Sequence, residues 1–201
     1  MLNKIKKSLQ ENIITEIKKR LQEFQELKNK NNQDWFNELC FCLLTANSKA
    51  ETAIKIQIEM SQNGFTEKTR TEIAYTIKKH GHRFHNTKAK YIFLARKFLN
   101  IKDILQNLPE NQTRAFLVNN IKGLGYKEAS HFLRNVGYNN FAIIDRHILR
   151  FLKKYNFINE IPKVISKKNY LEYEKILTNF NIEQSELDLI LWAHMTGKVL
   201  K

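Results

Sequence analysis

The stretch that decides the fold reads IKGLGYKEA and occupies residues 121–129. Gly123 and Gly125 flank a single leucine, and residues without a side chain permit a left-handed or closely packed backbone. Apolar residues at helical spacing follow the turn, so the pattern predicts a hairpin between two helices. The helix that opens near Tyr126 would direct its positive end and its unpaired N–H groups toward the turn. The backbone at the two glycines can therefore hold a phosphate, although an ordinary interhelical turn has the same local pattern.

Two chemical groups stand at defined places relative to this hairpin. Lys127 follows Gly125 by two residues, and Asp145 lies in the sequence IIDRH at residues 143–147. A neutral amine can attack the anomeric carbon of a sugar, and a carboxylate can stabilise the positive charge that develops as a base leaves. Each residue also has a plainer interpretation, a solvated lysine and a helix N-cap. Because both residues lie at defined spacings from the hairpin, we favour a function in cleaving a glycosidic bond in DNA.

Residues 121–137 resemble the helix-hairpin-helix of the DNA glycosylase superfamily that includes endonuclease III and the 8-oxoguanine glycosylases. Lys127 falls on the position of that superfamily's Schiff-base lysine, and Asp145 falls on its catalytic aspartate. The chain ends in GKVLK at residues 197–201, and a terminal lysine is typical of the compact type 2, mainly archaeal, 8-oxoguanine DNA glycosylase/AP lyases. The resemblance implies excision of 8-oxoguanine through a lysine Schiff base, followed by β-elimination that nicks the strand.

The same resemblance implies further contacts with double-stranded DNA that contains 8-oxoguanine. Asn47 ends the sequence LLTAN at residues 43–47 and matches the helix end that carries the gap-filling Gln or Asn; a helix C-cap is a compatible alternative. Residues 81–91 resemble the segment that faces the orphaned strand. Within that segment, Arg83 is a candidate contact to DNA, and Phe84 is either a wedge beside the extruded base or a core residue.

Three residues are candidates at the lesion itself. His147 could contact the sugar-phosphate, and Trp192 could stack on the flipped base, although both also fit a structural role. Lys201 offers a terminal carboxylate to the N7 proton and an ammonium group to the C8 carbonyl, the two features that distinguish 8-oxoguanine from guanine. Terminal residues usually fray, but the resemblance to the type 2 family favours a role for Lys201 in base recognition.

The charge of the chain indicates a polyanionic partner. The formal net charge is +14 and the isoelectric point is near 9.7, and nucleic acid is the usual partner of such a protein. Abundant lysine, asparagine and isoleucine are what an AT-rich genome would give, so composition bias explains part of this charge. The chain shows no secretory segment and no apolar run of about 18 residues. We therefore expect a cytoplasmic monomer that binds DNA and no membrane.

Cysteine usage limits the cofactors. Cys40 and Cys42 would point to different faces of a helix, so a disulfide is not expected. The endonuclease III branch carries four clustered cysteines near its C-terminus for an iron–sulfur cluster, and no cysteine follows Cys42 here. We expect no cluster, no other metal and no cofactor, while a monovalent cation at the hairpin backbone stays open.

Hydrophobic periodicity is helical almost throughout and predicts an all-α protein of roughly ten helices. Asp34 is the expected N-cap of a buried central helix. The resemblance implies two helical lobes, with the hairpin, about 110–137, at their junction and the active site in the cleft between them. Residues 1–29 would pack with the C-terminal lobe at 126–201, and residues 30–125 would form the middle lobe. The predicted helices cover residues 4–28, 35–46, 50–60, 67–79, 87–99, 101–107, 110–120, 126–137, 145–155, 167–179 and 184–195.

Two other functions remain compatible with the residues. The same lysine chemistry could act on another oxidised base, such as an oxidised pyrimidine. A helix-hairpin-helix can also serve as a DNA-binding module without catalysis, and such a module would have no need of Lys127 and Asp145 together.

Overall fold

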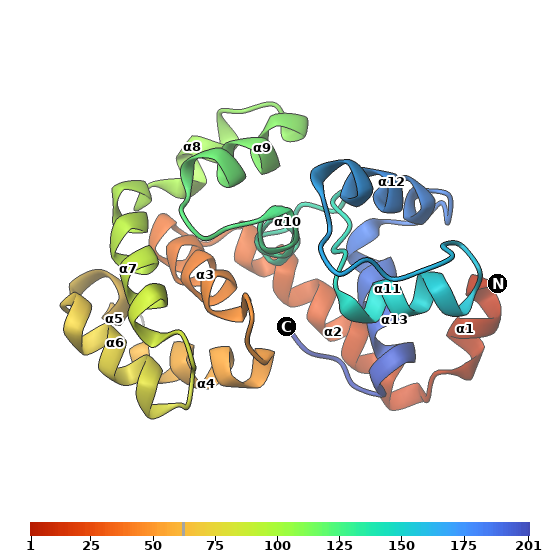
Figure 1. The fold of residues 1–201 in the computed structure, drawn as a ribbon, viewed down its shortest axis with the longest axis horizontal. Helices are drawn as coiled ribbons and strands as arrows, with labels where there is room; N and C mark the ends of the chain where they lie inside the picture. The colour runs from red at the N-terminus through yellow and green to blue at the C-terminus, as the bar shows by residue number, and fades with distance from the viewer. Residues whose placement is uncertain (62) are drawn as a thin grey trace. The chain divides into compact units, whose positions relative to one another are not determined.

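The computed structural model describes residues 1–61 and 63–201, and this part of the chain contains helices and turns but no strand (Figure 1). Thirteen α-helices and one short 3-10 helix follow one another along it. The prediction of an all-α protein is therefore confirmed. The thirteen α-helices of the described residues exceed the eleven predicted ranges because the long helix predicted for residues 4–28 is divided and the short helix α5 was not predicted. No helix in the described residues is long and apolar enough to cross a bilayer.

One compact unit comprises residues 27–132 and is built around α3. Every residue of α3 from Trp35 to Thr45 is buried, because this helix packs against α4, α7 and α8. Helix α6 packs along α7 and against α4, and α5 packs against α7. The helices are α3 (Asn32–Thr45), α4 (Ala50–Met60), α5 (Gly64–Glu67), α6 (Arg70–Lys79), α7 (His85–Ala95), η1 (Arg96–Phe98), α8 (Ile101–Gln106), α9 (Glu110–Asn120) and the start of α10 (Tyr126–Asn135).

The other compact unit combines the two ends of the chain, residues 1–26 and 133–201. Helix α13 is its centre and packs against α1, α11 and α12. The two boundaries between the units fall within α2 and within α10. The helices of this unit are α1 (Leu2–Ser8), α2 (Glu11–Lys28), α11 (Arg146–Lys154), α12 (Lys167–Thr178) and α13 (Gln184–Thr196).

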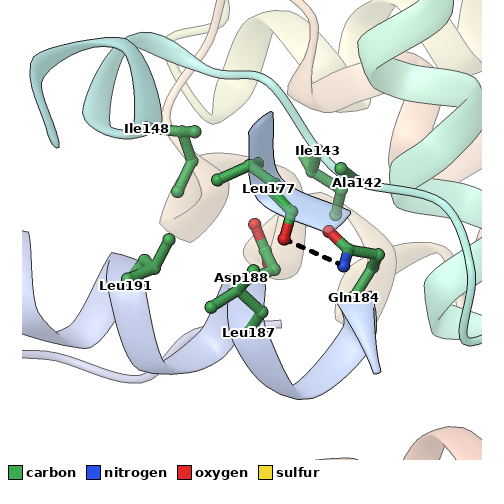
Figure 2. Close-up of a pocket in the computed structure, with 8 residues that line it drawn as sticks. All are labelled: Ala142, Ile143, Ile148, Leu177, Gln184, Leu187, Asp188 and Leu191. Carbon is green, nitrogen blue, oxygen red and sulfur yellow. Dashed lines mark hydrogen bonds between the residues drawn. The ribbon is translucent and has the colours of Figure 1, made fainter. Parts of the chain in front are cut away.

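The interior of this terminal unit contains a buried ion pair and a small hollow. Arg134 on α10 pairs with Asp188 on α13, and both side chains are almost fully buried. A small hollow lies beside Asp188 (Figure 2), where Gln184 donates from Nε2 to the Leu177 carbonyl at 3.4 Å. The hollow is otherwise lined mainly by apolar side chains, those of Ala142, Ile143, Ile148, Leu177, Leu187 and Leu191.

The single helix predicted for residues 4–28 is wrong. The first helix stops at Ser8, and Leu9 has an extended backbone. Ser8 Oγ donates to the Ile5 carbonyl at 2.7 Å, so its side chain satisfies a carbonyl at the end of the helix. Serine forms such local bonds readily, and apolar periodicity alone does not register them.

The N-cap predicted for the central helix is also wrong. Asn31, three residues earlier than Asp34, caps α3 by accepting a hydrogen bond from the Asp34 amide at 3.0 Å. Both residue types cap helices well. The helix start was predicted too late because the first apolar residue of the buried face is Trp35. Asp34 instead lies in the first turn, where its negative charge favours the positive end of the helix.

Candidate active site

The predicted hairpin joins α9 to α10 (Figure 1). Leu124 donates from its amide to the Ile121 carbonyl at 3.2 Å and closes the turn. Gly123 has a φ of +96°, and a Cβ atom built on it would lie 2.2 Å from Cδ2 of Tyr91 on α7. Both the left-handed backbone and the close approach of the ring therefore require glycine at this position. The sequence pattern identified the glycine but not Tyr91, which lies 32 residues earlier in the chain.

Lys127 is the second residue of α10 and faces a carboxylate that the sequence analysis missed. Its Nζ lies 3.7 Å from Oε1 of Glu128, and its side chain is 31% exposed. The other carboxylate oxygen of Glu128 accepts from the Gly125 amide at 3.3 Å. A glutamate that reaches back to the amide three residues earlier is half of a capping box. That spacing was visible in the sequence and could have identified Glu128.

A second lysine lies near the same helix start. Lys88 on α7 is only 4% exposed and donates from Nζ to the Leu43 carbonyl at 2.6 Å. Burial lowers the pKa of Lys88 to about 8; the charge of Glu128 raises this pKa and that of Lys127 lowers it, both by less. Lys88 therefore lies within electrostatic range of Lys127 and Glu128. The sequence does not identify Lys88 as buried, because hydrophobic periodicity does not mark a buried lysine in a chain so rich in lysine.

The candidate DNA contacts of this unit occupy exposed turns. Asn47 lies two residues beyond α3 and has a φ of +60°, so it also serves as the left-handed residue that ends a helix. Arg83 lies over the ring of Phe84, with 4.6 Å between Cζ and the ring centroid. Phe84 is 38% exposed, which excludes the alternative that it belongs to the core. Asn47, Arg83 and Phe84 are thus all presented at the surface.

Asp145, His147 and Trp192 gather in the terminal unit. Asp145 is the N-cap of α11, and its Oδ1 accepts from the amides of His147 and Ile148, both at 2.8 Å. Neither of these bonds uses Oδ2. The rings of His147 and Trp192 meet edge to face, with 5.8 Å between centroids. Helices α11 and α13 thereby bring an imidazole and an indole together, and the Asp145 carboxylate lies at the start of α11.

Lys201 ends a tail that leaves α13 (Figure 1). Gly197 stops this helix in the left-handed conformation, with a φ of +72°, and donates from its amide to the Ala193 carbonyl at 2.8 Å. Residues 198–201 follow without regular structure, and Lys201 is partly buried. Gly197 thus ends the helix, and the tail begins with a bond back to it, from the Lys198 amide to Thr196 Oγ1 at 3.3 Å.

The candidate residues are divided between the two units. Residues 27–132 carry Asn47, Arg83, Phe84, both hairpin glycines and Lys127, whereas the terminal unit carries Asp145, His147, Trp192 and Lys201. None of them lines the hollow in Figure 2. In residues 1–61 and 63–201, no three His, Cys, Asp or Glu side chains gather as they would around a metal ion.

Comparison with known proteins identifies the family. A family model described as 8-oxoguanine DNA glycosylase, of the helix-hairpin-helix type, matches residues 17–186. The chain belongs to this 8-oxoguanine DNA glycosylase family. The family predicted from the sequence is thereby confirmed.

Members of the 8-oxoguanine DNA glycosylase family resemble this chain over its whole length. The 8-oxoguanine DNA glycosylase/AP lyase of Methanocaldococcus jannaschii is 53% identical and is covered to 99%, with all of this chain aligned. A crystal structure of the M. jannaschii 8-oxoguanine glycosylase/lyase, in complex with a 15mer DNA containing 8-oxoguanine, has a TM-score of 0.94 and covers 100% of this chain and 99% of its own. The 8-oxoguanine DNA glycosylase of Thermotoga maritima, at 40% identity, has a TM-score of 0.90 and covers 100% of this chain and 98% of its own.

Proposed function

We propose that this chain is a bifunctional DNA glycosylase/AP lyase, which removes 8-oxoguanine from double-stranded DNA and then nicks the strand. The observation that carries the proposal is the full-length similarity, at 53% identity, to an 8-oxoguanine DNA glycosylase/AP lyase whose crystal structure contains 8-oxoguanine DNA. A damaged purine is inaccessible inside the duplex, so the nucleotide must first be extruded.

Lys127 supplies the nucleophile. Its neutral amine attacks C1′ of the extruded nucleotide, and the bond from C1′ to the base breaks with its electron pair on the base, which takes up a proton. Opening of the sugar ring leaves a protonated Schiff base on Nζ. The ammonium group must lose a proton before attack, and the carboxylate of Glu128, 3.7 Å from Nζ, can accept it, while the same negative charge favours the ammonium form at rest.

Asp145 stabilises the positive charge that develops on the sugar as the base leaves. The two bonds to its Oδ1 fix the carboxylate, and Oδ2 takes part in neither of them. The Schiff base then acidifies C2′, loss of the C2′ proton expels the 3′ phosphate, and water hydrolyses the remaining bond to Lys127. Both residues therefore have to act on the same nucleotide.

The remaining candidate residues hold the DNA. The backbone amide of Gly123 binds a phosphate at the positive end of α10, and the Gly125 amide joins it once it releases the Glu128 carboxylate. Asn47 fills the gap left by the extruded base, and Phe84, with Arg83 over its ring, acts as the wedge.

Residues of the terminal unit recognise the extruded nucleotide itself. His147 contacts the sugar-phosphate, and Trp192 stacks on the base. Lys201 reads the N7 proton and the C8 carbonyl. The proposal includes a monomer that acts in the cytoplasm without a metal or other cofactor, and a monovalent cation at the hairpin backbone is compatible with it.

Borohydride trapping tests this function. Duplexes with 8-oxoguanine, an oxidised pyrimidine or undamaged guanine are incubated with the protein and borohydride, and the adduct is mapped by peptide mass spectrometry. We expect an adduct on the 8-oxoguanine duplex, attached to Lys127 and absent from the Lys127→Gln variant. An adduct only on the oxidised-pyrimidine duplex would show that the substrate is another oxidised base. Binding to DNA without any adduct would show that the protein is a non-catalytic DNA-binding module.

A further inference from the structure

Two buried side chains hold the carboxyl end of α3. Lys88 donates from Nζ to the Leu43 carbonyl at 2.6 Å, and His82 Nε2 bonds to the Leu44 carbonyl at 3.0 Å. Both side chains are almost fully buried, at 4% and 3% exposure. Carbonyls at the end of a helix have no partner within the helix, and a cation is favoured there by the helix dipole. His82 and Lys88 together are called the polar clamp below.

The protonation of His82 follows from its two bonds. The Phe84 amide donates to Nδ1 of His82 at 3.1 Å, so Nδ1 carries no proton and Nε2 donates to the Leu44 carbonyl. Burial, with smaller contributions from the charges of Lys88 and His85, lowers the pKa of His82, while its backbone bonds raise it less. The ring is thus neutral at neutral pH, and both of its bonds are satisfied.

The polar clamp joins two segments that the proposed function places on DNA. Asn47 follows Leu44 by three residues. The clamped carbonyls therefore lie at the end of the helix just before the gap-filling side chain. Arg83 and Phe84 follow His82 directly and lie before the first turn of α7. The same imidazole therefore contacts the backbone on which Asn47 is mounted and the backbone of the candidate wedge.

The inner face of α7 also supports the hairpin. Lys88 lies within electrostatic range of Lys127 and Glu128, and Tyr91, three residues later on the same helix face, contacts the position of Gly123. The clamp, the hairpin and the nucleophile thus share one supporting helix within residues 27–132.

We propose that His82 and Lys88 are positioning residues for nucleotide extrusion, which hold Asn47 and Phe84 in register so that both enter the duplex together. The inference rests on the proposed function. A gap-filling residue and a wedge act on the same distorted base pair. If the two turns move independently, Asn47 and Phe84 do not enter the duplex together, and extrusion of the nucleotide becomes slower. Single-stranded abasic DNA needs no extrusion, and its cleavage depends on Lys127 but not on the register of the two turns.

Three variants each remove one bond of the clamp. His82→Gln keeps a donor near the Leu44 carbonyl and removes the acceptor for the Phe84 amide. His82→Asn keeps that acceptor and removes the bond to Leu44, and Lys88→Met removes the bond to Leu43. His80→Gln and Lys78→Met are matched controls, because these residues lie on or just after neighbouring α6 and make no contact with the clamp carbonyls.

Two substrates and one fluorescent signal separate positioning from chemistry. Excision is measured on duplex 8-oxoguanine DNA, strand cleavage is measured on single-stranded abasic DNA, and 2-aminopurine beside the lesion reports unstacking as the nucleotide is extruded. We expect each clamp variant to excise on the order of tenfold more slowly or worse, with a slower fluorescence rise, since small misplacements cost this much or more. Cleavage of single-stranded abasic DNA by the clamp variants should stay within about twofold of the parent protein. The control variants should keep both excision and cleavage within about twofold of the parent protein.

Equal losses on both substrates, or no loss on the duplex, would overturn the positioning role. Thermal unfolding identifies any variant that does not fold. If Lys88→Met is one, the two His82 variants decide the question, since each keeps one bond of the ring. Lys127→Gln distinguishes the two proposals: if it still cleaves single-stranded abasic DNA, the proposed nucleophile is wrong, whatever the clamp variants do.

Discussion

At the residue scale, Asp145 combines a structural and a chemical role in one carboxylate. Its Oδ1 caps α11 through two amide bonds, and asparagine can accept the same bonds without the charge. We therefore expect Asp145→Asn to slow excision by about a hundredfold or more while the free energy of unfolding hardly changes. Single-turnover excision and urea denaturation measure the two effects. Retained activity together with lost stability would reduce Asp145 to a helix cap.

Gly123 is constrained in two ways, and a second glycine separates them. Gly123 has a left-handed backbone and faces the ring of Tyr91, whereas Gly197 has a left-handed backbone with nothing within 4 Å of an added Cβ. Gly197→Ala should cost about 1 kcal/mol of stability from backbone conformation alone. Gly123→Ala should cost about 1–3 kcal/mol more because the ring must move. Chemical denaturation of both variants measures the difference, and equal costs would mean that the ring gives way freely.

At the element scale, one buried ion pair ties α10 to α13. Arg134 pairs with Asp188, also binds Asn135 Oδ1 from Nη2 at 2.8 Å, and lies over the ring of Phe24 on α2. Removing one partner leaves a buried charge uncompensated, so Asp188→Ala should lower the free energy of unfolding by about 3–5 kcal/mol. Glu59→Ala is the control, since Glu59 pairs at the surface with Lys79 and His80 and solvent-exposed pairs contribute little to stability. Similar losses in the two variants would show that burial adds nothing to the Arg134 pair.

Helix boundaries follow from local signals where such signals are unambiguous. Both α4 and α9 span the residues predicted for them, Ala50–Met60 and Glu110–Asn120, because polar or turn-forming residues end each apolar pattern on both sides. The pattern did not distinguish Asn31 from Asp34 as a cap, nor reveal the break after Ser8. In each of these places a short polar side chain bonds to the backbone, and hydrophobic periodicity contains no information about that bond.

At the scale of the whole molecule, the C-terminal tail, residues 198–201, has a proposed role in base recognition that deletion of Lys201 tests. Deletion of Lys201 removes the ammonium group and moves the terminal carboxylate, the two groups proposed to read 8-oxoguanine. We expect excision of 8-oxoguanine to fall much more than cleavage at a preformed abasic site, which presents no base. Lys198→Ala, an exposed lysine of the same tail, is the control for charge. Equal loss of both activities, or loss of neither, would remove the tail from recognition.

The net charge makes binding to DNA depend on salt. With a formal charge of +14, several phosphates should be neutralised, and the logarithm of the association constant should fall by about 0.9 per phosphate for each tenfold rise in salt. Fluorescence anisotropy with undamaged duplex DNA between about 50 and 200 mM salt gives this slope. A slope near zero would mean that the basic residues do not contact the DNA backbone.

The sequence by itself determined the helical class, the position of the hairpin and the family, because periodicity, glycine spacing and the register of Lys127 are properties of neighbouring residues. It also pointed to Lys127 and Asp145, whereas Glu128, the proposed proton acceptor, was missed although its spacing from Gly125 is local. The tertiary structure alone decided that Tyr91 lies against Gly123, that Phe84 is exposed, and that Lys88 is buried under the end of α3. These facts depend on which helices pack together, and contacts between residues 30 to 45 positions apart leave no local pattern in the chain.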